Sequence, residues 1–333
     1  MKSQALVISA LSAAVLLAQP ATEANIRRID PAFDKLVAPG SQVEKVAGGF
    51  QFIEGPVWYR PGGNLFFSDI PGNVIMQWSP AGGAKVFREH IFAGEYPAGK
   101  QVGTNGLTLD KQGRLIAAEH GNRRVSRIAK DGMLTVLADR FEGKRLNSPN
   151  DVVVKKNGDI YFTDPPFGLL NPGQALGDAA KNPLREMDFN GVFRITAPGK
   201  IEALAKDIAL PNGLAFSPDE KQLYVANSAN KTWSVYDVQS DGTLGNGRIF
   251  YDAAKETGAG VPDGMKVDSA GNIWATGPGG ILVISSQAKL LGVITFPEVP
   301  ANCAWGDADG KTLYATARTG LYRIKTNIAG IRP

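Results

Sequence analysis

The feature that most constrains this chain is a motif that recurs six times. Each copy has a polar residue, a small or turn residue, an apolar stretch, a turn rich in Gly, Asp or Asn, and a second apolar stretch. The copies begin at Glu54, Asn105, Asn150, Asn212, Asp263 and Asn302, at intervals of 51, 45, 62, 51 and 39 residues. Strand repeats of about 40–50 residues are typical of propeller blades with four strands each. The repeat therefore predicts an all-β, six-bladed β-propeller.

The composition and the last repeat refine this prediction. With 39 glycines and 21 prolines in 333 residues, the chain is too rich in helix breakers to consist mainly of long helices. The sixth repeat has only one further strand-like stretch, Gly320–Lys325, so it lacks a fourth strand. A strand-like stretch at residues 42–47 precedes the first repeat and has no other place. We expect it to complete the sixth blade, because this pairing removes an open edge between the first and last blades.

Residues 1–24 lie outside the repeat and have the pattern of a secretory signal peptide. Lys2 gives a positive start, 13 weakly polar to apolar residues follow from Ala5 to Leu17, and small residues lead to Ala24. This run is too short to span a bilayer. We expect residues 25–333 to form one domain, periplasmic or secreted and not inserted in a membrane. An uncleaved N-terminal anchor is the alternative.

The 62-residue interval contains a segment rich in Pro, Gly and Ala, at about residues 165–190. Loops of this length in compact domains are usually functional or disordered. The segment follows the second strand of the third blade, at the same end as the residues that begin each repeat. We interpret it as a lid over the site, with a surface insertion as the alternative.

Charge and rare residues exclude several classes of function. The net charge is +4, with basic residues scattered along the chain, which argues against nucleic-acid binding. The single cysteine, Cys303, excludes an internal disulfide and a thiolate metal cluster. Two histidines are too few for a His-rich zinc site. We expect a monomer or dimer that binds a small molecule.

The six residues that begin the repeats are all carboxylates or carboxamides. Innermost strands of a propeller converge on the axis, so these side chains should form a ring at one mouth of the channel. Oxygen ligands suit a hard divalent cation, calcium first, with magnesium or manganese as alternatives. Turn chemistry is the competing interpretation, since four repeats begin with Asn-Gly, Asp-Gly or a similar pair. It does not account for Glu54 before Gly-Pro or Asn302 before Cys.

Two basic side chains are candidates for contact with a substrate. His120 ends the second strand of the second blade and should face the ring, where it could titrate near neutral pH and move a proton. A structural histidine is the alternative. Arg145 lies in a loop shortly before Asn150 and could hold an anionic or polyol substrate, with ordinary loop basicity as the alternative.

Five motifs resemble the gluconolactonase family, which includes regucalcin (senescence marker protein). They are FIEGPVW at residues 52–58, LNSPNDVV at 146–153, YFTDPPFG at 161–168, LPNGL at 210–214 and PDGM at 262–265. The resemblance extends from about Val43 to Lys325 and is strongest toward the bacterial gluconolactonase type. Regucalcin-type relatives have an arginine two residues before the asparagine of the second motif, where this chain has Ser148. Arg145 could substitute for that arginine.

The resemblance implies a propeller with one catalytic divalent metal ion, for which calcium is expected and magnesium, manganese or zinc are alternatives. Carried over motif by motif, the ligands are Glu54, Asn150, Asn212 and Asp263. Asp263 is the first candidate for the general base and His120 the second. Asn105, His120, Arg145 and Asn302 are then expected to contact the substrate. The implied activity is hydrolysis of a sugar lactone, and glucono-1,5-lactone is the substrate we expect. A metal-dependent phosphotriesterase or aryl esterase and a non-catalytic sugar- or calcium-binding propeller are the alternatives.

Overall fold

A computed structural model of the chain describes residues 24–331. The first blade consists of β3 (Ile53–Tyr59), β4 (Asn64–Asp69), β5 (Val74–Ser79) and β6 (Gly83–Arg88), and the second of β7 (Thr104–Leu109), β8 (Leu115–Glu119), β9 (Arg124–Ile128) and β10 (Leu134–Ala138). The third consists of β13 (Val152–Val154), β14 (Ile160–Asp164), β15 (Gly191–Ala197) and β16 (Lys200–Ala205). The fourth consists of β17 (Pro211–Phe216), β18 (Gln222–Asn227), β19 (Thr232–Val238) and β20 (Leu244–Asp252).

The last two blades incorporate the N-terminal strands. The fifth blade contains β21 (Met265–Val267), β22 (Ile273–Gly277), β23 (Gly280–Ile284) and β24 (Leu290–Thr295), with β1 (Asn25–Arg28) as a fifth, outer strand. The sixth contains β25 (Asn302–Gly306), β26 (Thr312–Ala317) and β27 (Gly320–Lys325), and β2 (Glu44–Gly48) pairs with β27 as its outer strand. The expected closure of the sixth blade is therefore confirmed. A two-stranded hairpin of β11 (Arg140–Phe141) and β12 (Lys144–Arg145) lies outside the blades.

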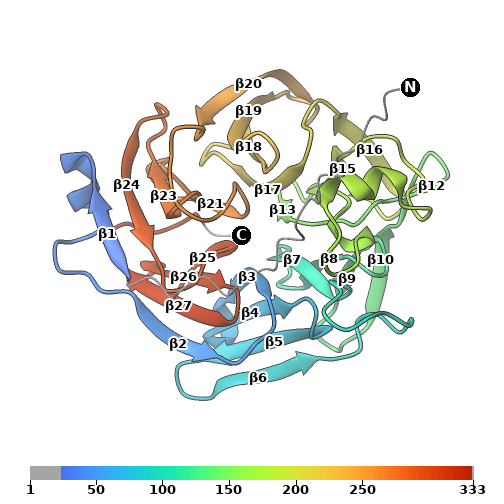
Figure 1. Cartoon of the computed structure of the whole chain (residues 1–333), viewed down its shortest axis with the longest axis horizontal. Coiled ribbons are helices and arrows are strands. Elements are labelled where there is room, and N and C mark those ends of the chain that lie inside the picture. Colours follow the sequence, from blue (N-terminus) through green and yellow to red (C-terminus); the bar gives the residue numbers. More distant parts are fainter. Residues whose placement is uncertain (1–23, 332–333) are drawn as a thin grey trace, which may run out of the picture.

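The six blades surround one axis (Figure 1). β3, β7, β13, β17, β21 and β25 are the innermost strands, and each contacts the next around the ring, with β25 returning to β3. All pairings within the blades are antiparallel, and several contain register shifts near the axis. This arrangement confirms the six-bladed propeller predicted from the repeat.

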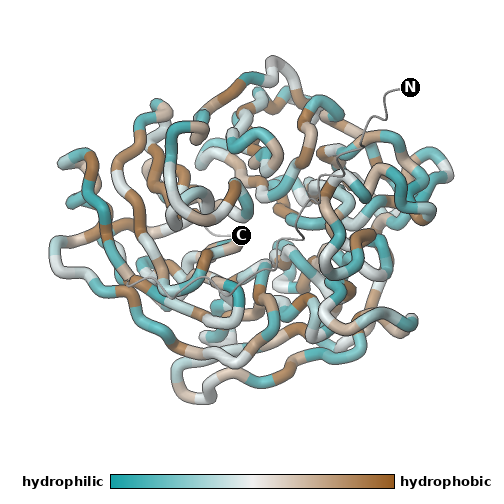
Figure 2. Tube along the Cα trace, viewed as in Figure 1, coloured by the Kyte–Doolittle hydropathy of each residue, from teal (hydrophilic) through white to brown (hydrophobic). Residues whose placement is uncertain are grey.

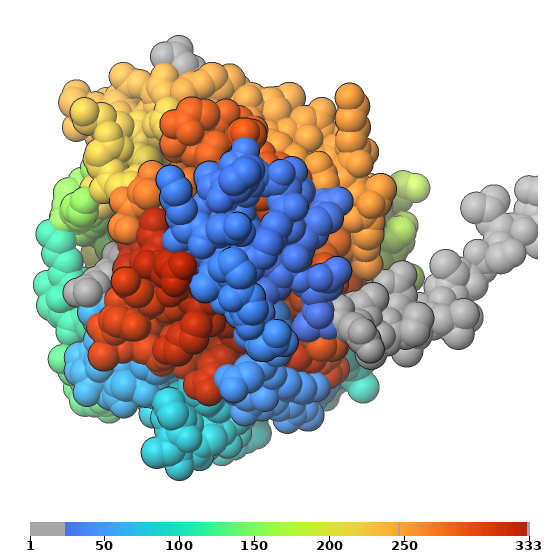
Figure 3. Space-filling model, turned by 90° about the vertical axis from the view of Figure 1, so that its left-hand side faces the viewer, coloured from blue at the N-terminus to red at the C-terminus, as the bar shows by residue number. Residues whose placement is uncertain are grey.

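Apolar side chains fill the spaces between neighbouring blades. One cluster combines Trp274 and Ile281 of the fifth blade with Cys303 and Tyr322 of the sixth, and Phe33 of the N-terminal segment belongs to it. Figure 2 shows apolar residues recurring along the strands, with polar residues concentrated in the connecting loops. Figure 3 shows the N-terminal segment lying across the fifth and sixth blades. The core is thus divided among the blade interfaces, and the N-terminal segment covers one of them.

Helical structure within residues 24–331 is limited to four short 3-10 helices. They are η1 (Pro31–Lys35), η2 (Arg60–Gly62), η3 (Phe167–Leu169) and η4 (Leu176–Lys181). None of these has the length and apolar character needed to cross a membrane. The signal peptide predicted for residues 1–24 lies, apart from its last residue, outside the described residues.

Candidate active site

The residues that begin the repeats all lie at or near the first residue of an innermost strand. Glu54, Asn105, Asn212 and Asn302 fall within β3, β7, β17 and β25, while Asn150 and Asp263 come just before β13 and β21. Asp263 is partly exposed and the other five are buried. Because the innermost strands surround the axis, these side chains gather from six blades at one end of the channel.

The glycines that follow these residues serve close packing between blades. A Cβ atom on Gly55 would lie 2.0 Å from the Asn105 carbonyl oxygen, and one on Gly213 would lie 2.3 Å from the Asp263 carbonyl oxygen. The Gly213 amide donates to that same carbonyl oxygen at 3.1 Å. β3, β7 and β17 also have register shifts at these positions, and such bulges redirect side chains. The turn interpretation of these pairs is therefore wrong, because they lie in or beside strands and bring adjacent blades together.

Hydroxyl groups on the second strands connect each of several blades to the next. Ser68 of β4 donates to the Asn105 carbonyl at 2.7 Å, and Thr163 of β14 donates to the Asn212 carbonyl at 2.7 Å. Beyond β18, Ser228 donates to the Pro262 carbonyl at 2.6 Å. These bonds satisfy buried backbone oxygens and fix the backbone of the residues at the channel mouth.

Three of the four expected metal ligands come together at this end of the channel. The Asp263 carboxyl interacts with the side chains of both Glu54 and Asn212, and both neighbours act on its pKa. Burial, together with the charge of Asp151, raises the pKa of Glu54 to about 7. Burial and the charges of Glu54 and Asp151 raise the pKa of Asp263 well above its ordinary value. Like charges held together away from water favour protonation or a bound cation.

The fourth expected ligand, Asn150, is joined to the neighbouring blade through its backbone. Its carbonyl accepts from the Gly106 amide at 2.6 Å, and its amide donates to the Thr163 carbonyl at 2.8 Å. The residue is buried, with 4% of its surface exposed. Asn150 is therefore held at the same mouth, beside the second blade.

Sequence reasoning missed Asp151, a third carboxylate of this cluster. It is buried, and its Oδ2 accepts from Asn302 Nδ2 at 3.4 Å. The Asn302 amide also donates to Glu54 Oε2 at 2.9 Å, so it connects two carboxylates. Alternation along a strand would place Asp151 and Asn150 on opposite faces, but both precede β13, where strand alternation does not apply. The adjacent Asn-Asp pair in the second motif was the available signal.

His120 lies beneath the channel mouth and is fully buried. Asn105 Nδ2 donates to His120 Nε2 at 3.2 Å. Burial lowers the pKa of His120 to about 3, so its imidazole is neutral at neutral pH. This differs from the expected titration near neutral pH, and it favours a role in orienting the Asn105 amide.

Arg145 belongs to the β11–β12 hairpin and binds neighbouring loops. Its guanidinium donates to the Asn122 carbonyl at 2.7 Å, and its amide donates to Glu186 at 2.8 Å. Ser148, at the position of the regucalcin-type arginine, is buried, and its hydroxyl donates to the Pro165 carbonyl at 2.6 Å. Arg145 and Ser148 therefore each hydrogen-bond to neighbouring loops near the mouth.

Asp164 holds the loop that leads to Asn150. Its two carboxylate oxygens accept from the amides of Asn147 and Ser148 at 2.7 and 2.8 Å. Burial raises the pKa of Asp164 to about 7, partly offset by these two amide donors and by Arg123. The buried carboxylate therefore fixes the backbone just before Asn150.

Residues 165–190 contain η3 and η4 and pack against the same mouth. The Gly168 amide donates to Ser148 Oγ at 2.9 Å, and a Cβ atom on Gly168 would lie 2.7 Å from His120 Cβ. Farther along, Lys100 donates to Asn171 at 3.0 Å, and Asn182 donates to the Leu169 carbonyl at 2.6 Å. The segment thus lies over His120, and its role as a lid stays a prediction.

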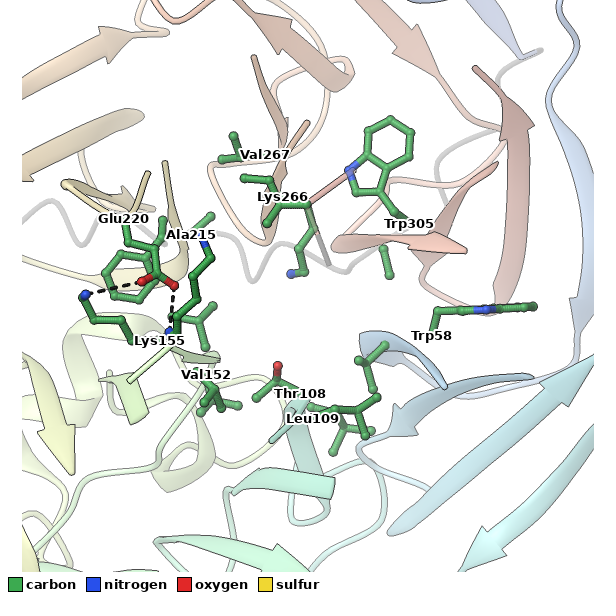
Figure 4. A pocket seen from close by; sticks show the side chains of 18 of the residues that line it. Trp58, Thr108, Leu109, Val152, Lys155, Ala215, Glu220, Lys266, Val267 and Trp305 are labelled. Carbon is green, nitrogen blue, oxygen red and sulfur yellow. Dashed lines mark hydrogen bonds and ion pairs between the residues drawn. The ribbon is translucent and has the colours of Figure 1, made fainter. Parts of the chain in front are cut away.

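A separate cavity of about 240 Å³ occupies the other end of the channel (Figure 4). It is lined by later residues of the innermost strands, including Trp58, Leu109, Val152, Phe216 and Trp305. Lys266 of β21 projects into it, and its Nζ donates to Asn302 Oδ1 at 3.3 Å. Lys266 therefore lies between the apolar cavity and the acidic mouth.

The donor set suits a hard cation that is bound by both acids and amides. Within residues 24–331, no group of three or more His, Cys, Asp and Glu side chains has an arrangement that could hold a metal ion. A site here would therefore need carboxamide oxygens in addition to carboxylates. Glu54, Asp263 and Asn212, with Asn150 nearby, supply that mixture, and the excess negative charge of the mouth fits a divalent cation.

The sequence pattern of the SMP-30/Gluconolactonase/LRE-like region matches residues 52–319. The chain belongs to this family. It is 35% identical to a gluconolactonase of Zymomonas mobilis over 324 residues, covering 93% of this chain and 88% of that protein. It is 29% identical to a pentonolactonase of Haloferax volcanii, covering 80% and 81% of the two chains. A solved gluconolactonase from Xanthomonas campestris has a TM-score of 0.78 and 32% identity, covering 92% of this chain and 99% of that one. The family resemblance predicted from the five motifs is confirmed.

Proposed function

We propose that this protein is a gluconolactonase-type hydrolase that opens sugar lactones, with glucono-1,5-lactone as its preferred substrate. The observation that carries the proposal is the convergence of Glu54, Asn212 and Asp263, from three different blades, at one point of the channel mouth. Relatives that align over most of the chain include a gluconolactonase and a pentonolactonase. They support a lactone as the substrate class, and glucono-1,5-lactone is the more specific part of the proposal.

In this proposal, Glu54, Asn150, Asn212 and Asp263 hold one divalent cation, with calcium preferred for an all-oxygen donor set. When bound, the cation supplies Lewis acidity that polarises the lactone carbonyl. Asn302 donates to Glu54 and keeps that carboxylate facing the mouth. Asn105, oriented by His120, presents its amide to the hydroxyl groups of the sugar.

Asp263 is the residue proposed as general base. Asp263 as a residue is partly exposed, whereas Glu54 and Asp151 are buried, so of the three acids it lies nearest to the solvent from which the attacking water would come. As the water oxygen attacks the carbonyl carbon, Asp263 accepts the water proton. The ring C–O bond then breaks, and the proton passes to the departing oxygen, which yields an open-chain hydroxy acid. His120 is the second candidate, but its burial favours a positioning role.

The residues 165–190 are proposed to cover the substrate, and residues 1–24 are proposed to direct the chain to the periplasm or out of the cell. Gly168 packs over His120, so the segment is anchored at the mouth it would cover. N-terminal sequencing of the exported protein would test whether residues 1–24 are removed on export, and a first residue near Asn25 is the expected result.

The test compares lactone hydrolysis by the full chain before chelation, after chelation, and after calcium is returned. We expect activity to be lost with chelator and restored with calcium. Asp263→Asn should lower kcat/KM by at least about 100-fold, because general-base contributions are typically of that size. Asp131→Asn, in an exposed turn of the second blade, is the matched control and should keep full activity.

A substrate panel separates the remaining alternatives. Phosphotriesters and aryl esters turned over faster than aldonolactones would favour the other metal-dependent hydrolase. Tight sugar binding without turnover of any of these compounds would indicate a binding propeller. Full lactonase activity after complete removal of metal would contradict the proposed role of the cation.

A further inference from the structure

Lys266 is a cationic side chain whose ammonium group reaches the acidic mouth from below. Its strand β21 begins directly after the Asp263-Gly264 pair, and its side chain lines the cavity at the opposite end of the channel. In Figure 4 it extends into the space between the strands that carry Thr108, Val152 and Trp58. The Nζ atom donates to the Met265 carbonyl at 2.9 Å and to Asn302 Oδ1 at 3.3 Å.

Two donors to Asn302 Oδ1 together determine which way the Asn302 amide faces. Asn302 Oδ1 accepts from Lys266 Nζ and from the Cys303 amide, the latter at 2.8 Å. Its Nδ2 group must therefore point toward the carboxylates, where it donates to Glu54 Oε2 at 2.9 Å and Asp151 Oδ2 at 3.4 Å. Asn302 thus acts as a hydrogen-bond donor to the carboxylates, and its oxygen is not available to a cation.

Lys266 also changes the charge of the mouth. Glu54, Asp151 and Asp263 act on one another electrostatically, and the Lys266 ammonium acts on Glu54 with the opposite sign. With all three carboxylates ionised, one ammonium leaves two net negative charges, which a single divalent cation neutralises. Without the ammonium, the loaded mouth would keep a negative charge, and this would oppose the oxyanion that develops when a lactone carbonyl is attacked.

We propose that Lys266 is a positioning residue that restrains the cation affinity of the mouth, by supplying a fixed positive charge beneath the carboxylates and by holding the Asn302 amide toward them. The inference rests on the cation site of the proposed function and does not depend on which substrate is hydrolysed. Because the ammonium repels a divalent cation, its removal should tighten cation binding even though one hydrogen bond is lost.

Calcium binding to the metal-stripped full chain tests this directly, with titration calorimetry at constant ionic strength. Lys266→Met keeps the length of the side chain without its charge and should lower the Kd for calcium at least tenfold. Lys266→Arg keeps the charge and should stay within threefold of the wild type. Lys111→Met is the matched control, because Lys111 lines the same cavity and is exposed. An unchanged or higher Kd for Lys266→Met would overturn the proposal.

A second measurement requires no bound cation. In chelator, Lys266→Met should lower the melting temperature, because the carboxylates lose their compensating charge. Adding Asp151→Asn to this variant should recover part of the loss, because one carboxylate charge is removed. Equal melting of Lys266→Met and the wild type in chelator would refute the compensating role. If the wild type binds no calcium, the proposed cation site fails, and the chelator experiment still decides the role of Lys266.

Discussion

Burial has opposite consequences for the acidic and basic side chains near the channel mouth. It raises the pKa values of Glu54 and Asp263, and it lowers that of His120. Both effects follow from one cause, since removal from water penalises the charged form of either group. Among these residues, neutral His120 is suited to accept a hydrogen bond, while the carboxylates are suited to a cation that restores their charged form.

The low pKa of His120 predicts how stability changes in acid. An unfolded chain takes up a proton near the ordinary value of 6.5, whereas folded His120 does so near 3. Between these values the unfolded state binds more protons, so stability falls as pH decreases through this window. We expect His120 to contribute a loss of about 1.4 kcal/mol per pH unit. Urea unfolding at pH 7 and pH 5 measures it.

Substitution of the two histidines isolates that contribution. His120→Gln keeps an acceptor for the Asn105 amide and should reduce the loss of stability between pH 7 and pH 5. His90→Gln is the control, because the His90 side chain is 85% exposed. Its pH dependence should match the wild type. Identical pH dependence in His120→Gln and the wild type would contradict the buried, neutral imidazole.

At the residue level, the sequence predicts which side chains lie at the channel mouth better than it predicts which residues they contact. The polar residue that begins each repeat identified Glu54, Asn212 and Asp263, because equivalent positions in a propeller meet at the axis. That rule does not include Asp151, which follows Asn150 directly and joins the cluster because of the backbone course before β13. Nor could it indicate the contact of Arg145 with the Asn122 carbonyl, because the hairpin that carries Arg145 is set by long-range packing.

At the scale of strands, four of the six innermost strands have, at or just before their start, a glycine packed so closely against the next blade that there is no space for a side chain. Gly213 shows this in β17, where its amide bonds to the Asp263 carbonyl. The same contact that orders the strand also positions Asn212 beside Asp263. At this position, the same backbone contact therefore determines both the packing between two blades and the geometry of the candidate site.

Gly213→Ala should consequently damage both stability and the site. The added methyl group would lie 2.3 Å from a backbone oxygen, so the two strands must separate. We expect a loss of about 1–3 kcal/mol, as for other overpacked sites, together with weaker calcium binding. Denaturant unfolding and calorimetry measure the two effects. Gly177→Ala, where a methyl group would meet nothing within 4 Å, should change neither, and equal behaviour of both variants would contradict the close contact.

Strands with regular apolar patterns were predictable, and an irregular one was not. The missing fourth strand of the sixth repeat predicts that the stretch at residues 42–47 joins the sixth blade, and β2 pairs there. β1 was not anticipated. Its sequence, NIRR, has little apolar content, and it joins the fifth blade through backbone pairing with β24.

At the scale of the whole molecule, the N-terminal segment packs against both the fifth and the sixth blade and connects them. Phe33 is fully buried there, and the Arg28 guanidinium donates to the Val37 and Ala38 carbonyls, both at 2.8 Å. Between β1 and β2 the segment crosses from the fifth blade to the sixth. The ring therefore depends on residues distant in sequence from the blades they join.

Phe33→Ala tests this dependence. Loss of a buried phenyl ring usually costs about 3–5 kcal/mol, and we expect a loss of that size in the free energy of unfolding. Phe87→Ala is the matched control, because Phe87 is 43% exposed on β6, and it should cost less than about 1 kcal/mol. Urea unfolding measures both. A loss below 1 kcal/mol for Phe33→Ala would show that the segment does not hold the blades together.

The pairing of β2 with β27 has a consequence for the order of events during synthesis. These strands occupy residues 44–48 and 320–325, so the partner of β2 is made only after the other blades. Contacts between such distant segments form slowly. In a ribosome-bound nascent chain, β2 consequently has no partner strand until β27 has been made. Refolding should show a late kinetic phase in which β2 pairs with β27. A covalent tether between these two strands should accelerate that phase.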